Sequence, residues 1–428
     1  MTITSADTEL RGLAVPLRDN RSLDRLVEIA ADVEVMMLGE ASHGTHEYYA
    51  WRDTLTRRLV SEQQVRYLAV EGDWPDCYRV NQYVKGYDVE ASSARDVLGA
   101  FDRWPTWMWA NEEVADLVEW LRSFNDGRAD SDKVGFYGLD VYSLWDSLSI
   151  VADYLQEQRP DLVEDAQRAF GCFEPFGPEF VTYGWASQSC ADEIVPLLRS
   201  ARQTVREQAD GSDESLLHVE QNARVLENAE QYYRVMLRSD NASWNLRDTH
   251  MFQTLQRLAQ FHPAGRGLVW AHNTHVGDAR ATSMAWSRTI NIGQLARESY
   301  ADAAALVGFS GHRGRVIAGD SWGAPRRSMV VPPAQPGSWE DVLHSALGQD
   351  SLLMLRDENL GETFARQRGH RAIGVVYHPE QERGNYVPTV LPDRYDALLH
   401  LEETTALHPL EAPAPTGAEP PETFPAGT

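Results

Sequence analysis

Residues 35–46 of the chain read Val-Met-Met-Leu-Gly-Glu-Ala-Ser-His-Gly-Thr-His. An apolar run of strand type ends at Gly39, and a tight loop then presents Glu40, Ser42 and His43 before an amphipathic segment begins. In α/β proteins, acid and base side chains stand at the carboxyl ends of buried strands, beside the start of a helix. The stretch therefore predicts an α/β fold and marks this loop as the place to look for chemistry.

Short apolar runs of the same kind recur along the chain, with helical patterns between them. The runs are 33–38 before Glu40, 67–70 before Glu71, 134–139 before Asp140, 267–271 before His272, 303–309 before Ser310 and His312, and 372–377 before His378. Short apolar runs bounded by breakers suit strands that are buried on both faces of a parallel sheet. Their alternation with helices predicts a mostly parallel sheet flanked by helices.

The helix expected after the first loop carries an arginine on its buried face. Thr45 can cap the helix, and one face of it is formed by Tyr48, Arg52, Leu55 and Leu59. A buried arginine needs a carboxylate or ligand partner, unless it reaches solvent from the edge of the face. The sequence allows both alternatives for Arg52.

Residues 145–262 differ from the rest because they hold few strand-like runs and long helical patterns. Residues 215–261 read as one continuous helix or two nearly continuous ones. We therefore expect a discontinuous α/β core, residues 1–144 and 263–406, with a helical insertion at 145–262. From residue 407, a high proline content without apolar periodicity predicts a disordered tail, 407–428.

Composition argues against several classes of protein. The 428 residues carry a formal net charge of −25, which disfavours nucleic acid and anionic membrane partners. No stretch approaches the roughly 20 apolar residues of a membrane span, and the N-terminus does not resemble a signal peptide. Cys77, Cys172 and Cys190 are too few and too scattered for a disulfide framework or a metal clip. We expect a cytoplasmic protein with free thiols.

The polar residues at the strand ends form a possible site. If the strands are parallel, one edge of the sheet gathers Glu40, His43, Glu71, Asp140, His272, His275 and His312. A single histidine at a strand end is usually structural, but several histidines and carboxylates at one edge indicate a site. A histidine paired with a glutamate supplies a general base near neutral pH.

A second motif lies at residues 270–277, Trp-Ala-His-Asn-Thr-His-Val-Gly. The spacing of His272 and His275 lets both imidazoles face one point on a turn. One interpretation is a pair of metal ligands completed by Glu71 or Glu40. Another is a pair that transfers protons and stabilises an oxyanion without a metal, and the third is two ordinary hydrogen-bonded histidines.

Other signals are weaker. The glycine-rich residues 308–314 match no phosphate-binding pattern, and no Gly-x-Ser-x-Gly elbow is present. The aromatic residues Phe101, Trp104, Trp107 and Trp109 either wall an apolar substrate cleft or pack in the core. The residues that we expect to contact substrate are Trp107, His46, Asp140 and His312.

In order and approximate spacing, these motifs resemble those of the erythromycin esterase family over about residues 20–400. The resemblance is carried by Gly39-Glu40-Ala41-Ser42-His43-Gly44, by Glu47-Tyr48-Tyr49 with Arg52, by Glu71-Gly72, by Gly138-Leu139-Asp140 and by Ala271-His272-Asn273-Thr274-His275. It implies an α/β core with a helical insertion and hydrolysis of a macrolactone ester. It also implies that the catalytic histidine is His43 with Glu40 as its partner, and that the family's arginine, second acid and paired histidines are Arg52, Glu71, His272 and His275.

We therefore expect a carboxylic ester hydrolase that acts on an ester or lactone, without a covalent acyl-enzyme. His43 would take a proton from water, and Arg52, His272 or His275 would stabilise the oxyanion. Glu71 would be a second base or an acid with a raised pKa. No cofactor is expected, with a divalent metal on His272, His275 and Glu71 as the alternative.

The expected partner is a small molecule, either a macrolide or another lactone. Macrolide resistance belongs to only some members of the family, so the resemblance does not identify the substrate. A binding protein without turnover, and a biosynthetic enzyme that uses the same site, are further alternatives.

Overall fold

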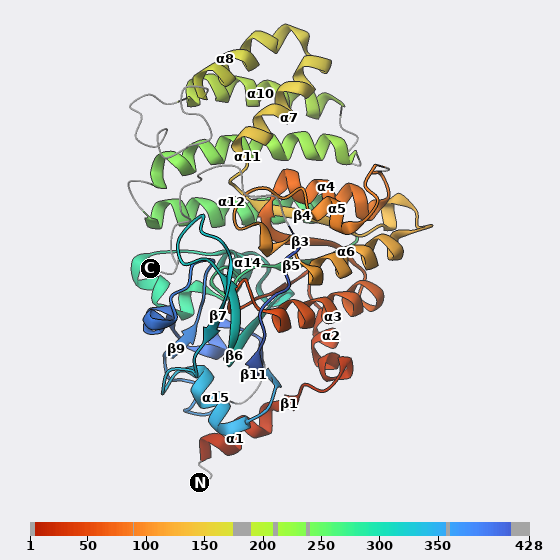
Figure 1. Cartoon of the computed structure of the whole chain (residues 1–428). Helices are drawn as coiled ribbons and strands as arrows, with labels where there is room; N and C mark the ends of the chain where they lie inside the picture. The colour runs from red at the N-terminus through yellow and green to blue at the C-terminus, as the bar shows by residue number, and fades with distance from the viewer. Residues whose placement is uncertain are drawn as a thin grey trace.

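The computed structural model describes residues 5–88, 90–173, 190–208, 213–236, 240–356 and 360–411. Within them a nine-stranded mixed sheet has the order β1-β8-β11-β6-β2-β5-β3-β4, and β7 pairs with β6 (Figure 1). The strands of this sheet are β1 (Ala14–Pro16), β2 (Val35–Leu38), β3 (Val65–Asp73), β4 (Gly135–Asp140), β5 (Arg266–Trp270), β6 (Ala304–Ala318), β7 (Arg327–Val331), β8 (Ser351–Met354) and β11 (Ala397–Thr404). A separate pair is formed by β9 (Arg368–Arg371) and β10 (Tyr386–Thr389).

Six neighbouring strands of the large sheet are parallel, from β11 through β6, β2, β5 and β3 to β4. β1, β7 and β8 join it in antiparallel pairings. The α/β class with a mostly parallel sheet, predicted from the apolar runs, is confirmed.

Helices cover both faces of the sheet, and the strands divide their side chains between them. In β2, Met36 and Leu38 pack into the core on one face, whereas Val35 and Met37 pack into the core on the other. The first face is covered by α2 (Asp24–Ala30), α3 (His46–Glu62), α4 (Trp74–Lys85), α5 (Ala94–Leu98) and α6 (Glu112–Asn125). The second face is covered by α1 (Ser5–Leu13), α12 (Asp240–Phe261), α14 (Ile292–Tyr300) and α15 (Trp339–Leu347). Burial on both faces explains why these strands read as continuous apolar runs.

The described residues between β4 and β5 form helices only. They are α7 (Leu144–Gln158), α8 (Val163–Phe173), α10 (Ala191–Gln208), α11 (Glu214–Met236) and α12. The first four share an apolar cluster of their own, stacked beyond α12 at the end of the molecule away from the N-terminus (Figure 1). α12 instead packs on the sheet through Met251, Leu255 and Leu258. The division of the chain into domains stays a prediction. By its packing, α12 belongs to the layer of helices on the second face of the sheet.

Most of the predicted elements are present. Five of the six predicted strands are found, and residues 215–261 form the two helices α11 and α12. The run 372–377 is not a strand, because it makes only isolated bridges, Ile373 with Ser42 and Val376 with Gly319. Its apolar side chains are buried because the segment lies over other elements of the core, and not because it pairs within the sheet. Thr45 is the residue before α3, but its hydroxyl bonds Ser42 and not the helix backbone.

Two further expectations differ from the structure. Cys172 and Cys190 form a disulfide, so the expectation of free thiols holds only for buried Cys77. The pairing could not be read from spacing, because the fold of α8 and α10 brings the two residues together. The disordered tail that we expected does not begin at residue 407, because Leu407 and Leu410 are buried and their N–H groups donate to the carbonyls of Gly44 and Ala110. Residues 412–428 lie outside the described residues.

Among the described helices, none combines the length and the apolar character that crossing a bilayer requires.

Candidate functional site

Four adjacent parallel strands bring polar residues to one edge of the sheet. Glu40 follows β2, His272 follows β5, Glu71 lies near the end of β3, and Asp140 ends β4. β2 and β3 flank β5 and stay in register with it up to Trp270, so the strand ends are level. The edge predicted from the strand ends is therefore formed by β2, β5, β3 and β4.

Arg52, Glu40 and His43 form a buried chain of contacts. Arg52 donates from Nη2 to Glu40 Oε2 at 2.5 Å, and Glu40 Oε1 lies 2.8 Å from Nδ1 of His43. The Arg52 side chain is 0% exposed, and its guanidinium lies 4.3 Å from the ring centre of Tyr49 and 4.5 Å from that of Trp270. Of the two alternatives for Arg52, the structure has the carboxylate partner. The arginine charge and the aromatic faces hold Glu40 in one orientation, and Glu40 holds His43.

The loop that carries His43 is held closely by neighbouring backbone. The N–H of Asn273 donates to the carbonyl of Glu40 at 2.8 Å. A Cβ at Gly39 would stand 2.1 Å from Oδ1 of Asn273, and one at Gly44 would stand 1.9 Å from the carbonyl oxygen of Ile317. Both glycines are therefore needed for the close approach of this loop to β5 and β6.

His272 begins the short helix α13 (Asn273–Val276) and caps it with its own side chain. Nδ1 accepts the N–H of Thr274 at 3.3 Å and lies 2.8 Å from the Thr274 hydroxyl. In a neutral imidazole that accepts at Nδ1, the proton is on Nε2. That Nε2 atom is buried and makes no hydrogen bond of good geometry among the described residues, although the backbone of Ala41 interacts with the ring. The ring centre of His272 is 4.8 Å from that of His43, and burial, together with the charge of a protonated His43, holds the pKa of His272 well below its usual range.

His275 lies between two carboxylates. Its Nδ1 is 2.9 Å from Oδ1 of Asp248, its Nε2 is 3.2 Å from Oε1 of Glu71, and its ring stacks on Trp244 at 4.5 Å. Burial would lower the pKa of His275, but Asp248 and Glu71 outweigh burial and raise that pKa to about 10. The ring is therefore an imidazolium that donates a hydrogen bond on both sides.

Glu71 is held as a carboxylate. Its Oε2 accepts the N–H of His272 at 2.7 Å, and its Oε1 accepts Nη2 of Arg247 at 3.0 Å. Burial alone would raise the pKa of Glu71. The charges of His275 and Arg247, together with that of His43 when its ring is protonated, outweigh burial and keep that pKa well below its usual range. The suggestion that Glu71 is an acid with a raised pKa is therefore wrong, because the neighbouring groups are cations.

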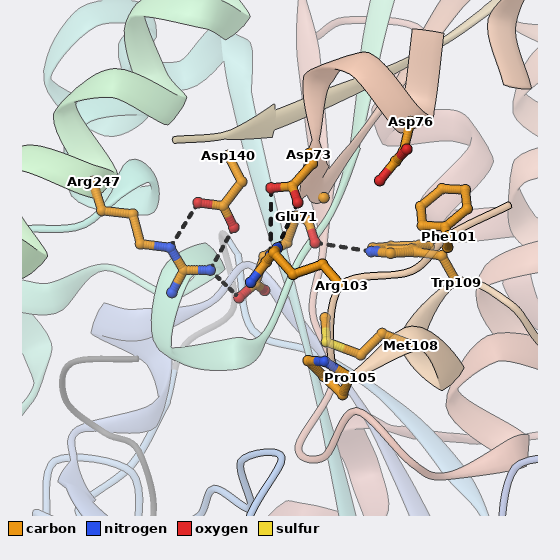
Figure 2. Close-up of a pocket in the computed structure, with 11 residues that line it drawn as sticks. Glu71, Asp73, Asp76, Phe101, Arg103, Pro105, Met108, Trp109, Asp140 and Arg247 are labelled. Carbon is orange, nitrogen blue, oxygen red and sulfur yellow. Dashed lines mark hydrogen bonds and ion pairs between the residues drawn. The ribbon is translucent and has the colours of Figure 1, made fainter. Parts of the chain in front are cut away.

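Arg247 joins Glu71 to Asp140 (Figure 2). Its Nε donates to Oδ1 of Asp140 at 2.9 Å, and its Nη2 donates to Oδ2 at 2.6 Å. Burial would raise the pKa of Asp140, but Arg247 lowers it. Asp140 is thus engaged by an arginine and acts on the site through it.

A cleft opens beside Glu71 (Figure 2). Its apolar wall is formed by Phe101, Pro105, Met108 and Trp109, and its polar residues are Glu71, Asp73, Asp76, Arg103, Asp140 and Arg247. Trp109 donates from its indole N–H to the carbonyl of Glu71 at 3.0 Å, which fixes the aromatic wall to β3. Arg103 donates to Asp73 at 2.5 Å, whereas burial and then the charge of Asp73 raise the pKa of Asp76 to about 7. The cleft therefore presents an apolar wall opposite acidic groups.

A sequence model of the erythromycin esterase family matches residues 60–404. That range includes Glu71, Asp140, His272 and His275 at the ends of β3, β4 and β5, whereas Glu40, His43 and Arg52 lie before it. The chain belongs to the erythromycin esterase family. The resemblance seen in the motifs is confirmed.

Two relatives carry names connected with this family or with hydrolysis. The erythromycin esterase type II of Escherichia coli is 26% identical over 148 residues, which are 33% of this chain and 33% of that protein. The chain thus matches about a third of that relative's length. YbfO of Bacillus subtilis (strain 168), whose name describes it provisionally as a hydrolase, is 20% identical over 410 residues, 90% of this chain and 87% of that protein.

Solved structures of low sequence identity share the fold. A succinoglycan biosynthesis protein superposes with a TM-score of 0.76 at 19% identity, over 94% of this chain and 97% of that chain. A mutant of the erythromycin esterase EreC in its open conformation superposes with a TM-score of 0.69 at 16% identity, over 91% of this chain and 95% of that chain. The same fold is thus also present in a protein that is named for biosynthesis.

Three residues that we expected to contact substrate have other partners in the structure. His312 stacks on His344 of α15 with 3.8 Å between ring centres, because β6 continues past the sheet edge to Ala318. His46 turns to Glu113 at the start of α6, with 2.5 Å from Nδ1 to Oε1. Trp107 is 2% exposed and packs in the core, which was the alternative interpretation of the aromatic cluster, whereas Phe101 and Trp109 line the cleft.

The sequence analysis missed Arg247 and Asp248, which join the candidate site from α12. A signal was present. Trp244, Asp248, Met251 and Leu255 fall at helical spacing on one buried face. Arg52 drew attention because it is a charged residue on a buried helical face. The same argument would have singled out Asp248.

The donor atoms of His272, His275 and Glu71 are not arranged as a metal site. Both ring nitrogens of His275 face carboxylates, and Nη1 of Arg247 lies 3.3 Å from Nε2. Among the described residues, one group brings three potential ligand atoms within 4.8 Å of one another, and it consists of His46, Glu113 and His408.

Proposed function

We propose that the chain is a hydrolase that cleaves an ester or lactone with a histidine-activated water and without a covalent acyl-enzyme. The observation that carries the proposal is the buried chain Arg52–Glu40–His43, with the neutral ring of His272 beside His43. Membership of the erythromycin esterase family supports the reaction class, as do the names of the two relatives.

His43 is the proposed general base. Its Nδ1–H donates to Glu40, so Nε2 carries the lone pair that takes the proton from water as the water attacks the carbonyl carbon. The imidazolium that forms is stabilised by Glu40, as a buried carboxylate stabilises the histidine of a catalytic triad. It then gives its proton to the leaving alkoxide oxygen as the acyl C–O bond breaks, which leaves the acid and the alcohol and restores neutral His43. Arg52 is a positioning residue, because it holds Glu40 and not the reacting atoms.

His272 is the proposed oxyanion donor. Its Nε2–H is buried and makes no hydrogen bond of good geometry among the described residues, and the proposal is that it turns from the backbone of Ala41 to the developing negative charge. A single donor of this kind is worth on the order of 3 kcal/mol of transition-state stabilisation. Glu71 lines the cleft as a carboxylate, and in this proposal it accepts a hydrogen bond from the attacking water.

The proposed reaction needs no metal ion at this site. The potential ligands support this view, because both ring nitrogens of His275 are engaged by Asp248 and Glu71. The guanidinium of Arg247 lies beside Nε2 of His275, where its charge would repel a metal cation. The alternative, a divalent ion held by His272, His275 and Glu71, requires that removing the ion abolish turnover. We expect dialysis against a chelator to leave turnover unchanged.

The proposed partner is a small molecule, an ester or lactone that enters the cleft beside Glu71. Macrolides are among the candidates, because the relative from Escherichia coli is named for erythromycin. The aromatic and apolar wall formed by Phe101, Met108 and Trp109 suits the hydrocarbon part of such a ring.

The deciding experiment is mass spectrometry of products across an ester and lactone panel, from small rings to full macrolides. We expect a product heavier than its lactone by one water. His43→Ala should lower kcat by about a hundredfold or more, and Glu40→Gln should lower it by a smaller factor. His378→Ala is the matched control, because His378 also lies near a carboxylate, 3.7 Å from Glu380, but at the surface.

Unchanged turnover by His43→Ala would refute the proposed base. Recovery of a tightly bound but intact lactone, with no product from any panel member, would instead indicate a binding protein. A product other than the hydrolysed ester would indicate a biosynthetic reaction on the same site.

A further inference from the structure

A second group of histidines and a carboxylate lies outside the hydrolase site. Nδ1 of His46 is 2.5 Å from Oε1 of Glu113, and Nδ1 of His408 is 2.7 Å from the same oxygen. The three potential ligand atoms lie within 4.8 Å of one another. The two imidazole rings meet edge to face, with 5.1 Å between their centres.

We propose that His46, Glu113 and His408 form a binding site for one Zn²⁺ ion. Two imidazole nitrogens and a carboxylate oxygen are a donor set that zinc takes in proteins, with water in the fourth position. The donor atoms of a tetrahedral zinc stand roughly 3.3 Å apart, so the present spacing needs only a small adjustment of the side chains. The fourth position would face water, because the His408 side chain is 62% exposed and that of His46 is 36% exposed.

The site joins three segments that are far apart in sequence. His46 is the first residue of α3, Glu113 lies in the first turn of α6, and His408 follows β11. Backbone hydrogen bonds already connect the same segments: the N–H of His46 donates to Thr405 at 3.0 Å, and the N–H of Glu112 donates to His408 at 2.9 Å. Because these hydrogen bonds already hold the three segments together, the three ligands need little further ordering before they bind an ion.

A bound ion would fasten both walls of the hydrolase site. His46 comes three residues after His43 in the loop that carries the proposed base, and α6 follows the segment that places Trp109 in the cleft. The role proposed for the ion is to fasten residues 405–410 to these segments. It takes no part in the reaction, so the zinc site does not depend on the hydrolase proposal.

The test is equilibrium dialysis and calorimetry of the full chain with Zn²⁺ alone, after removal of metals with a chelator. We expect one ion per chain, and we expect affinity to fall about tenfold or more in His408→Ala and in Glu113→Gln. Zn²⁺ should raise the thermal midpoint of the wild type. Co²⁺ in place of Zn²⁺ should give the visible absorption of a tetrahedral site, and this absorption should be lost in His408→Ala.

His378→Ala is the matched control and should bind Zn²⁺ as the wild type does, since it removes a surface histidine near a carboxylate elsewhere. His408 is exposed, so its variant keeps the test valid even if Glu113→Gln fails to fold. Binding of Zn²⁺ by His408→Ala with wild-type affinity and stoichiometry would overturn the proposal. Absence of stoichiometric binding by the wild type would overturn it as well, and the contacts of Glu113 would then be hydrogen bonds only.

Discussion

His272 and His275 of the candidate site differ in charge because they have different neighbours. His272 accepts at Nδ1 from Thr274 and has a lowered pKa, so it is neutral. His275 lies between Asp248 and Glu71 and has a raised pKa, so it is a cation. One ring is thus the neutral donor of the proposed mechanism, whereas the other holds two carboxylates in place.

The charge of His275 predicts a loss of stability at high pH. Its pKa is raised from 6.5 to about 10 in the folded chain, so the stabilisation is fully present below pH 6.5 and is lost as pH rises toward about 10. We expect the free energy of unfolding of the wild type, measured in urea, to fall across this interval. In His275→Asn that contribution to the slope should be absent, and in His378→Asn it should persist.

A direct measurement guards against failure of the His275 variant to fold. Imidazole ¹³C chemical shifts of histidine-labelled wild type should include one ring that remains protonated well above pH 6.5. If every ring titrated near its ordinary pKa, the arrangement of His275 between Asp248 and Glu71 would be contradicted.

Single residues show how far sequence reasoning could reach. Arg52 was found because it breaks the apolar face of a helix, and it pairs with Glu40 as a buried charge must. The charge state of Glu71 was not accessible in this way. Its pKa depends on Arg247 and on His275, which are far away in sequence and meet it only in the folded chain.

The disulfide connects two of the helices that lie outside the sheet layers. Cys172 is in α8, and Cys190 directly precedes α10, with a sequence separation of 18 residues. Closing a loop of this length removes unfolded-state entropy worth about 3 kcal/mol. We expect replacement of both cysteines by alanine to destabilise the helical layer by about that amount in urea unfolding.

Reducing agent should reproduce this loss in the wild type and should have no effect on the double variant. Cys77 is a free thiol in the core and is present in both the wild type and the double variant. Any effect of reductant on Cys77 would therefore be the same in both proteins. A wild type that is indifferent to reductant would contradict the prediction.

Two elements mark the limits of reading strands from apolar runs. β6 extends to Ala318, well past the end of its apolar run, because β7 and β11 supply hydrogen-bond partners along its length. Residues 372–377 have the composition of a strand but only isolated bridges, because they cover other elements at the surface of the core. A strand needs neighbours, and the identity of those neighbours is not a local property of the sequence.

The chain has separate apolar clusters, and these predict unequal local stability. Two clusters flank the sheet, and a third is formed mainly by α7, α8, α10 and α11. We expect amide hydrogens of β2, β3 and β5 to exchange most slowly, since these strands are central and buried on both faces. Amides of α8 and α10 should exchange faster, as measured by hydrogen exchange with mass spectrometry.

Equal protection of the helical layer and the central strands would refute this expectation and would indicate a single cooperative unit. Exchange in the presence of reductant provides the comparison, because loss of the Cys172–Cys190 bond should accelerate α8 and α10 and leave the central strands unchanged.

The sequence by itself determined the fold class, the loop that carries Glu40 and His43, and the place of Arg52 on the inward face of its helix. These features depend on local periodicity, which is visible along the chain. Only the tertiary structure decided that Arg247 and Asp248 join the site, that His275 is charged and that His312 lies elsewhere. The reason is physical: a pKa and a buried ion pair depend on distances between charges that are remote in sequence, and those distances exist only after the strands have been ordered and paired.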